Sequence, residues 1–252
     1  MIDKNTIINE LHRVLEPLPF IRAFWLEGAD AAGYADEYSD IDFWVDCEDA
    51  QEEEAIAVVE DALARLSPID YRYICHHSHP KIRQRIYHLA GTGEYLMIDF
   101  CWQLHSRPRE EYGWYENDPV EAVKVIFDRD RIIRYRPMDP ADYVEGNRIR
   151  LQEACYRRSQ YCRVVKYIRR GQYPEAYAYY NRYVLEPLID LLRLIHTPAY
   201  SDYYLIHISR HIPEKERKRL EYFLQTASLT DMEKKIPQAG AWFDELLCRV
   251  SV

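Results

Sequence analysis

The spacing of hydrophobic residues near the start of the chain changes from helical to strand-like. Apolar residues recur every three or four positions over Lys4–Leu15 and the pattern stops at Pro17, which predicts a helix. Residues 20–27 and 39–46 are short apolar-rich runs bounded by turn-forming residues, and they predict two strands. The small residues and glycines of 28–33 lie between them, so we expect a strand, loop, strand unit.

The next part of the chain adds one helix and several strands. Acidic residues crowd the start of 48–66 and apolar residues form one stripe along it, which is typical of a helix. The N-terminal half is therefore expected to be α+β. The remaining predicted elements are strands at 71–75, 82–89 and 95–103 and an edge hairpin at 123–135.

The pattern beyond residues 137–140 is helical to the end of the chain. Charge changes at the same point, because residues 1–138 hold 15 basic and 27 acidic side chains whereas residues 139–252 hold 18 and 15. The sequence thus predicts two domains, an α+β domain at 1–138 and a helical bundle at 139–252. Breaks between helices are expected near Gly171, Pro198, Pro213 and Pro237.

The composition bounds the class of protein. With 252 residues, 48% of them hydrophobic, the chain can bury a sizeable core, which excludes a disordered tail protein. The formal net charge of −9 argues against binding to the phosphate backbone of nucleic acids. Scattered cysteines, an N-terminus unlike a signal peptide and charges in every apolar run lead us to expect a cytoplasmic protein with no nucleic-acid and no membrane partner.

Three aspartates carry the candidate chemistry. Asp40 and Asp42 stand two positions apart on a predicted strand, so their carboxylates project from one face. Two carboxylates this close favour a cation, and Mg²⁺ prefers carboxylate oxygens together with water and substrate phosphates. Asp99 lies on a mostly apolar predicted strand, where a lone ionised carboxylate is costly without a metal or a partner. We therefore expect these aspartates to form one site for one or two Mg²⁺ ions.

Structural roles for the same aspartates stay open at this point. Asp40 and Asp42 could belong to a solvated strand end, and Asp99 could pair with Arg83 or Arg85 on a neighbouring strand. The run at 75–79 holds one cysteine and three histidines but does not predict a zinc site. Adjacent ligands on an extended chain point to opposite faces, and no second pair lies at metal-site spacing.

The three aspartates belong to a longer pattern of small and acidic residues. Its members are Gly28, Ala31, Gly33, Asp36, Ser39, Asp40, Ile41, Asp42 and Asp99. In this spacing they resemble the G-S-x-A-x-G, D-x-x-S-D-I-D and later strand aspartate of the DNA polymerase β superfamily of nucleotidyltransferases. Within it, the resemblance is to the small-molecule branch that contains the aminoglycoside nucleotidyltransferases. Ala29 departs from the pattern, since the family has a serine there that is expected to contact the nucleotide phosphates.

The resemblance implies a nucleotidyltransferase fold, a mixed β-sheet flanked by helices, followed by a helical domain that binds substrate. It implies that Gly28, Ala29, Gly33 and Ser39 contact the nucleotide, with backbone amides in place of the missing hydroxyl. The helical half contains a stretch at 166–176 similar to the K-x-x-x-R-G-x-x-x-E-A of such enzymes, which would bring Lys166 to the triphosphate. Independently, helical spacing places Arg158 in an apolar stripe, where a guanidinium needs an anion.

The function implied is transfer of a nucleoside monophosphate, AMP from ATP or another from its triphosphate, onto a hydroxyl of a small acceptor, with release of pyrophosphate. Asp40 and Asp42 would hold Mg²⁺, and Asp99 would bind a second ion or take the hydroxyl proton. The acidic first half favours a cationic, aminoglycoside-like acceptor. Two alternatives stay open: a degenerate fold that binds nucleotide or a partner without catalysis, suggested by Ala29, and an enzyme that modifies a protein hydroxyl.

Overall fold

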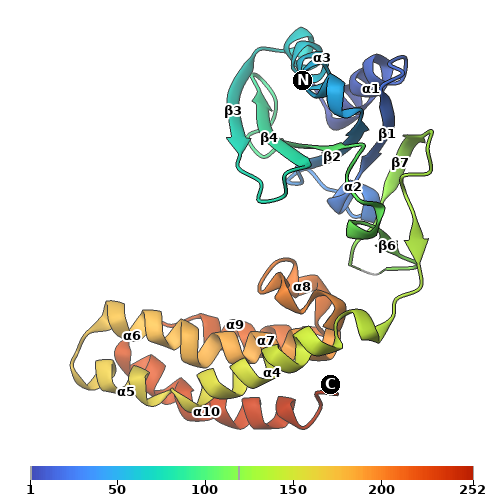
Figure 1. Ribbon diagram of the computed structural model, residues 1–252. Helices are drawn as coiled ribbons and strands as arrows, with labels where there is room; N and C mark the ends of the chain where they lie inside the picture. Colours follow the sequence, from blue (N-terminus) through green and yellow to red (C-terminus); the bar gives the residue numbers. More distant parts are fainter. Residues whose placement is uncertain (1, 119, 252) are drawn as a thin grey trace. The chain divides into compact units, whose positions relative to one another are not determined.

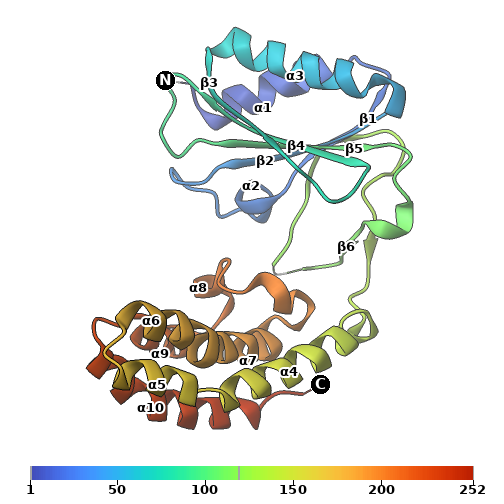
Figure 2. The same ribbon diagram turned by 60° about the vertical axis from the view of Figure 1, so that its left-hand side comes forward.

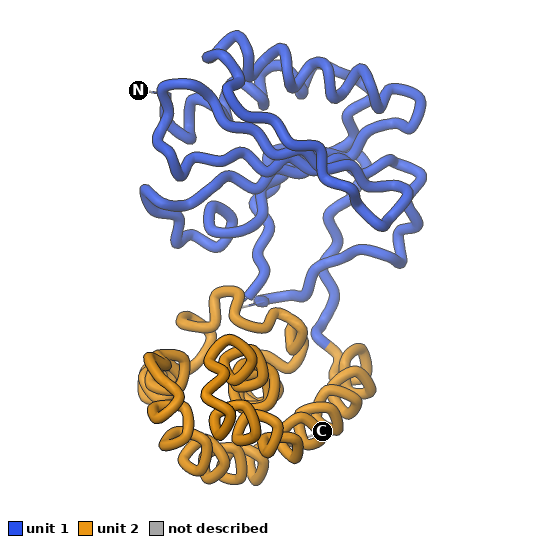
Figure 3. The backbone as a smooth tube through the Cα atoms, turned by 90° about the vertical axis from the view of Figure 1, so that its left-hand side faces the viewer, with its two compact units in different colours: residues 1–138 blue, residues 139–252 orange. Residues whose placement is uncertain are grey.

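The computed structural model describes residues 2–118 and 120–251. The chain divides into two compact units, residues 1–138 and 139–252, and each has its own hydrophobic core (Figure 3). The first unit combines a sheet with helices and the second is helical, so the fold is α+β, as the sequence predicts (Figures 1 and 2). Within the described residues, no helix has the length and apolar character needed to cross a membrane.

A six-stranded mixed sheet forms the centre of the first unit. Its strands lie in the order β3-β4-β5-β2-β1-β7. Neighbours are antiparallel except for β2 and β5, which run parallel and bring two distant segments side by side. The strands of this sheet are β1 (Ile21–Leu26), β2 (Ile41–Cys47), β3 (Ile69–Cys75), β4 (Ile82–Leu89), β5 (Ile98–Leu104) and β7 (Lys124–Asp128).

Two helices, α1 (Lys4–Leu15) and α3 (Glu52–Leu66), cover one face of this sheet (Figure 2). Alternate strand residues point toward them, and Phe24, Phe43 and Phe100 pack together there with ring centroids 5.4 to 6.5 Å apart. The helix predicted at 4–15 is confirmed to the residue, because its apolar stripe faces this core. Short 3₁₀ segments in this unit are η1 (Asp49–Gln51) and η2 (Arg109–Glu111).

The opposite face of the sheet carries a smaller apolar cluster. Trp25 and Trp44 stack there with ring centroids 5.8 Å apart. A separate parallel pair of short strands, β6 (Trp114–Tyr115) and β8 (Tyr135–Arg136), contributes a third indole to the same cluster. Among the described residues of the unit, no helix of the size of α1 or α3 covers this face. Side chains that its strands project here can therefore contribute to a site.

Residues 28–33 form a short helix where a loop is predicted. Helix α2 (Gly28–Ala32) ends at Gly33, whose φ of +78° suits a residue without a Cβ and whose N–H donates to the carbonyl of Ala29. The stretch contains three alanines, which have the highest helix propensity, and this favours a helical turn over an extended loop.

The hairpin predicted at 123–135 is wrong. Strand β7 pairs with β1, whereas β8 pairs with β6. The carboxylate of Asp128 accepts the backbone N–H groups of Ile132 and Ile133, each at 2.9 Å. This side chain turns the chain away from β7 before a second strand can pair with it.

The second unit is a helical bundle whose core includes Leu188, Leu192, Phe223 and Trp242. The expected breaks near Gly171, Pro198 and Pro213 coincide with helix ends. The α-helices are α4 (Val144–Ser159), α5 (Cys162–Arg169), α6 (Tyr173–Tyr180), α7 (Glu186–His196), α8 (Ile208–His211), α9 (Glu214–Leu224) and α10 (Leu229–Leu247). The other helical segments are η3 (Pro140–Asp142), η4 (Asn181–Leu185), which is a π-helix, and η5 (Pro198–Tyr203).

The break expected at Pro237 is wrong, because this residue lies inside α10. The proline removes one helical N–H donor. The helix continues because Ile236, Ala239 and Trp242 are buried in the bundle core, and burial of that face outweighs the lost hydrogen bond.

Candidate active site

Asp42 and Asp99 lie side by side on the two parallel strands. Asp42 is the second residue of β2, Asp99 is the second residue of β5, and the two are direct partners in the strand register. Neighbouring strands lie about 4.8 Å apart, so both carboxylates leave the sheet at the same height. They leave it on the face away from α1 and α3, because the residues that follow them, Phe43 and Phe100, belong to the helix-covered core.

The carboxyl of Asp42 is crowded by like charges. Burial, followed by the negative charges of Asp40, Asp99, Glu27 and Asp30, raises the pKa of Asp42 to about 7. Among the described residues, no Lys or Arg forms an ion pair with it to offset these charges. A cation at this point would relieve both causes of the raised pKa.

Asp99 is held by an amide rather than by a base. The Gln84 Nε2 group donates to both carboxylate oxygens of Asp99 at 2.8 Å, from the neighbouring strand β4. Burial raises the pKa of Asp99, and the bond from Gln84 lowers it by less. The alternative ion pair with Arg83 or Arg85 is wrong, since these bond Glu52 and Glu60 at 2.6 and 2.5 Å.

Asp40 and Ser39 lie just before β2, at the exposed end of the strand. The carbonyl of Asp40 accepts a hydrogen bond from Lys4 Nζ at 2.9 Å, and the same ammonium pairs with Asp30 at 3.1 Å. The Ser39 hydroxyl donates to Asp36 Oδ1 at 2.9 Å and accepts from the backbone N–H of Asp36 at 3.0 Å. Ser39 therefore shapes the turn that leads into the strand, a role that sequence reasoning did not assign to it.

Gly28 packs directly against the carboxylate of Asp42. A Cβ placed on Gly28 would lie 1.9 Å from Asp42 Oδ2, and its φ of +60° also favours glycine. The first glycine of the sequence pattern is therefore required by geometry at the aspartate. Ala29 follows within α2, and its carbonyl accepts the backbone N–H of Tyr34 at 3.1 Å.

The donor set suits a hard divalent cation in part. Asp42 and Asp99 supply two adjacent carboxylates, the oxygen donors that Mg²⁺ combines with phosphates and water. Within the part of the chain that the structure describes, no three His, Cys, Asp or Glu side chains gather as a ready metal group. The residues present therefore fit an ion completed by a bound phosphate, and they do not form an all-protein cage.

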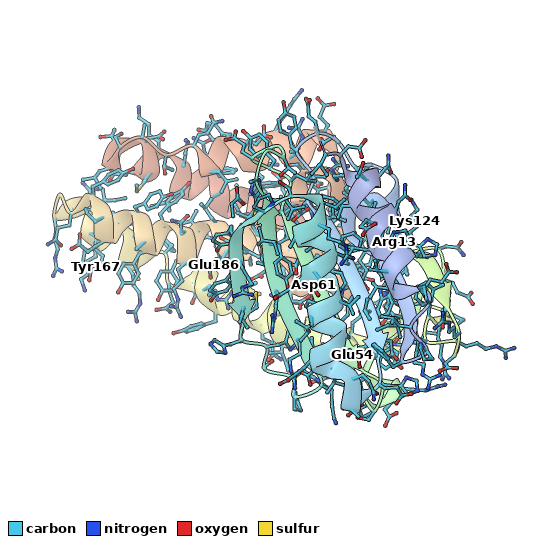
Figure 4. All side chains as sticks on the ribbon, turned by 90° about the horizontal axis from the view of Figure 1, so that it is seen from above. Arg13, Glu54, Asp61, Lys124, Tyr167 and Glu186 are labelled. Carbon is cyan, nitrogen blue, oxygen red and sulfur yellow. The ribbon has the colours of Figure 1, made fainter. Side chains whose placement is uncertain are left out.

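Two further predicted residues, Lys166 and Arg158, belong to the second unit. Lys166 is exposed on α5, with its ammonium 5.2 Å from the ring centroid of Tyr167, which Figure 4 labels. The guanidinium of Arg158 lies against Gly240, where an added Cβ would be 2.0 Å from Nη2. Its Nε is buried without a hydrogen-bond partner among the described atoms, so the prediction that Arg158 takes an anion stays a prediction.

Sequence reasoning missed one cluster beside Asp42. Glu27 follows β1, its backbone N–H donates to the carbonyl of Asp42 at 3.0 Å, and its carboxyl lies among Trp25, Trp44 and Trp114. The signal was an acidic residue directly between an apolar strand and Gly28, two residues after a tryptophan. The third tryptophan comes from a distant segment and carried no such signal.

Comparisons with known proteins add two structural likenesses. No protein-family model matches the chain, and no curated protein matches it significantly. An aminoglycoside 6-adenyltransferase from Bacillus subtilis is similar at 13% identity and a TM-score of 0.36, over 100% of this chain and 91% of that chain. A spectinomycin adenyltransferase from Enterococcus faecialis, crystallised with ATP and spectinomycin, is similar at 10% identity and a TM-score of 0.35, over 98% and 100%. TM-scores of this size do not establish a shared fold.

Proposed function

We propose that this protein is a nucleotidyltransferase that moves a nucleoside monophosphate, AMP when the donor is ATP, to a hydroxyl of a small acceptor. One observation carries the proposal: Asp42 and Asp99 are register partners on parallel strands, and Gly28 of the preceding motif packs against the Asp42 carboxylate. Motif residues that are separate in sequence thus converge on one point. An Asp-x-Asp that occurred by chance at a strand end would not be expected to meet both the preceding glycine and an aspartate of a distant strand.

The roles of the carboxylates follow from their positions. Asp42, with Asp40 and Asp99, would hold Mg²⁺, which when bound neutralises phosphate charge. The acceptor oxygen forms a bond to the α-phosphorus, the bond from that phosphorus to the pyrophosphate oxygen breaks, and a carboxylate takes the hydroxyl proton. Gln84 fixes the orientation of Asp99, which suits either a second ion ligand or this proton acceptor.

Residues in each unit are proposed to contact the nucleotide. Gly28, Ala29 and Gly33 would offer backbone groups to the phosphates, and Ser39 would support the same segment through Asp36. Lys166 and Arg158, which belong to the helical domain at 139–252, would neutralise charge on the triphosphate. Arg158 has support in the structure, because its unpartnered buried Nε needs an acceptor.

A transfer assay with matched aspartate variants tests the proposal. The protein is incubated with Mg·ATP and a panel of aminoglycosides, lincosamides and other hydroxyl compounds, and pyrophosphate release and product mass are measured. We expect Asp42→Asn to lower turnover by at least about 10²-fold, since it removes charge at the reacting phosphate. Asp61→Asn is the control, because Asp61 is exposed on α3, away from the aspartate face (Figure 4). Wild-type turnover by Asp42→Asn would overturn the assignment.

One observation favours a second candidate function. Ala29 offers no hydroxyl to the nucleotide, which would suit a fold that binds nucleotide without transferring it. Calorimetric titration with Mg·ATP separates the two. Nucleotide binding without turnover across the whole acceptor panel would support the binding module, whereas a new adenylylated product would exclude it. Intact mass spectrometry of co-expressed proteins would show whether the acceptor is a protein hydroxyl.

A further inference from the structure

A cavity of about 450 Å³ lies in the second unit. Its walls come from the end of α4, from α5 and from α10, and α5 and α10 lie side by side (Figures 1 and 2). Cavities that bind small molecules in proteins measure about 300 to 1,000 Å³, so this one is large enough for a ligand. Every residue that lines it belongs to the second unit, so it does not depend on the first. The residues that matter most here are Arg158, Val165, Arg169, Glu233, Ile236 and Pro237.

Arg158 brings a guanidinium to this cavity without an acceptor. Within residues 2–118 and 120–251 it forms neither a hydrogen bond nor an ion pair, and its Nε is buried. A guanidinium has five N–H donors and stays charged at any physiological pH. Leaving such a half-buried charge without a partner lowers the stability of the fold. An anion in the cavity would supply the missing acceptor.

Two neighbours determine where this guanidinium lies. Its Cζ is 5.1 Å from the centroid of the Tyr161 ring, which also lines the cavity. On Gly240 of α10, an added Cβ would lie 2.0 Å from Arg158 Nη2 and 3.0 Å from Cζ, so only glycine leaves room for the guanidinium there. The aromatic ring offsets the charge only in part. The charge is thus positioned before any ligand arrives, which lowers the entropy cost of binding.

The other charged residues of the cavity are paired with each other. Glu233 is the acidic residue among those that line it, and its carboxylate pairs with Arg169 at 2.8 Å, from α10 to α5. This carboxylate therefore does not compensate Arg158. Two arginines and one glutamate leave the cavity with one positive charge. An anion with a single negative charge would balance it.

The rest of the wall is apolar and limits the kind of anion that fits. Val165 comes from α5, and Ile236 and Pro237 come from α10. Pro237 has no N–H to donate, and its ring presents carbon atoms to the cavity. An organic ligand gains free energy by removing these side chains from water, whereas an inorganic anion leaves them hydrated. The cavity therefore favours an anion that carries an apolar body.

We propose that this cavity binds a small organic monocarboxylate, with its carboxylate at Arg158 and its apolar body against Val165, Ile236 and Pro237. A carboxylate matches the planar fork of a guanidinium, with which it forms paired hydrogen bonds. Binding of this ligand does not depend on the proposed nucleotidyl transfer. One consequence does rest on it: since the proposed function also assigns Arg158 to the triphosphate, the monocarboxylate and the nucleotide would exclude each other.

A ¹⁹F NMR titration of the full-length protein with 4-fluorobenzoate tests this, in the absence of ATP and Mg²⁺. 4-Fluorobenzamide is the matched ligand, with the same ring and no charge. Arg148→Gln is the matched variant for Arg158→Gln, since Arg148 is exposed on the same helix. We expect 4-fluorobenzoate to bind wild type and Arg148→Gln equally, and at least about tenfold more weakly to Arg158→Gln, which loses a charge-assisted contact. 4-Fluorobenzamide should bind all three proteins equally weakly.

A second variant and a competitor test the apolar wall. Val165→Thr keeps the shape of the side chain but adds a hydroxyl, so we expect it to weaken both aromatic ligands by about threefold or more. Inorganic phosphate has charge without an apolar body and should displace 4-fluorobenzoate only at a concentration at least about tenfold higher. Circular dichroism and the unfolding midpoint check that each variant folds. Equal affinities for the two aromatic ligands, for Arg158→Gln and wild type, or for phosphate and 4-fluorobenzoate would overturn the inference.

Repeating the titration with Mg·ATP present separates this inference from the proposed function. We expect Mg·ATP to displace 4-fluorobenzoate, because both ligands would need Arg158. Binding of 4-fluorobenzoate that Mg·ATP does not displace would support the inference and contradict only the assignment of Arg158 to the triphosphate. Nucleotidyl transfer by a protein that does not bind 4-fluorobenzoate would contradict only the inference.

Discussion

Replacing Asp42 by Asn should stabilise the metal-free protein at neutral pH while it lowers the proposed transfer activity. Asp42 is partly buried beside other carboxylates, and its pKa rises from about 3.8 in an unfolded chain to about 7 in the fold. Between these pH values the unfolded chain has lost a proton that the folded protein retains. The free energy of unfolding therefore falls as pH rises from about 4 to about 7. Above pH 7 it is lower by the full cost of ionising Asp42 in the folded protein.

The magnitude follows from the two pKa values. The two pKa values differ by about three, and each pKa unit corresponds to about 1.4 kcal/mol, so ionised Asp42 lowers the unfolding free energy by about 4 kcal/mol above pH 7. Asn has nearly the same shape and no charge, so the variant avoids this cost. We expect the two proteins to unfold with equal free energies at pH 4, and the variant to be more stable by up to about 4 kcal/mol at pH 8.

Urea unfolding from pH 4 to pH 8 in the presence of EDTA measures this difference. Four of the five tryptophans lie in the first unit, so tryptophan fluorescence mainly reports its unfolding. Asp61→Asn on α3 is the control and should follow wild type at each pH. If the difference in unfolding free energy between Asp42→Asn and wild type is the same at pH 5 and pH 8, then the carboxyl is not destabilised by burial and like charge.

Two substitutions test the local geometry. Gly28→Ala should lower the unfolding free energy by several kcal/mol and remove transfer activity, because its Cβ would lie 1.9 Å from Asp42 Oδ2. Gly91→Ala is the control, since its φ is also positive, at +76°, but no atom lies within 4 Å of the added Cβ. In urea unfolding it should cost only about 1 kcal/mol. Asp128→Ala should lower the unfolding free energy by about 2 kcal/mol, since two backbone N–H groups lose their acceptor, and an unchanged urea midpoint would show that water replaces it.

Local elements were predictable wherever periodicity alone decided them. The helix at 4–15 and the strand at 82–89 have the predicted bounds, because an apolar stripe marks the helix and the turn-forming residues at 90–93 end the strand. The hairpin at 123–135 failed because strand pairing is a non-local choice, and here β1 and β6 are the partners. The helix break predicted at Pro237 was wrong for a related reason, since packing of α10 in the bundle core outweighs the local effect of the proline.

In the candidate site, too, local sequence patterns predicted some features and missed those that depend on distant residues. Asp42 was chosen from sequence for its spacing from Asp40 and Asp99 for its place on an apolar strand, and the structure makes the two register partners. Ser39 and Asp40 matched a motif, but their present contacts serve the turn before β2, which spacing does not reveal. The cluster of indoles around Glu27 includes Trp114 of β6, and no local pattern joins that strand to β1.

The acidic excess of the first unit is distributed unevenly between the two faces of its sheet. On the helix side, Glu10, Glu52 and Glu60 each pair with an arginine at 3.0 Å or less. On the other side, Asp42 and Glu27 have no such partner among the described residues. Ion pairing that served stability alone would not leave these half-buried carboxyls without a basic partner. A face that concentrates negative charge in this way attracts cations, which agrees with the proposal that it holds Mg²⁺.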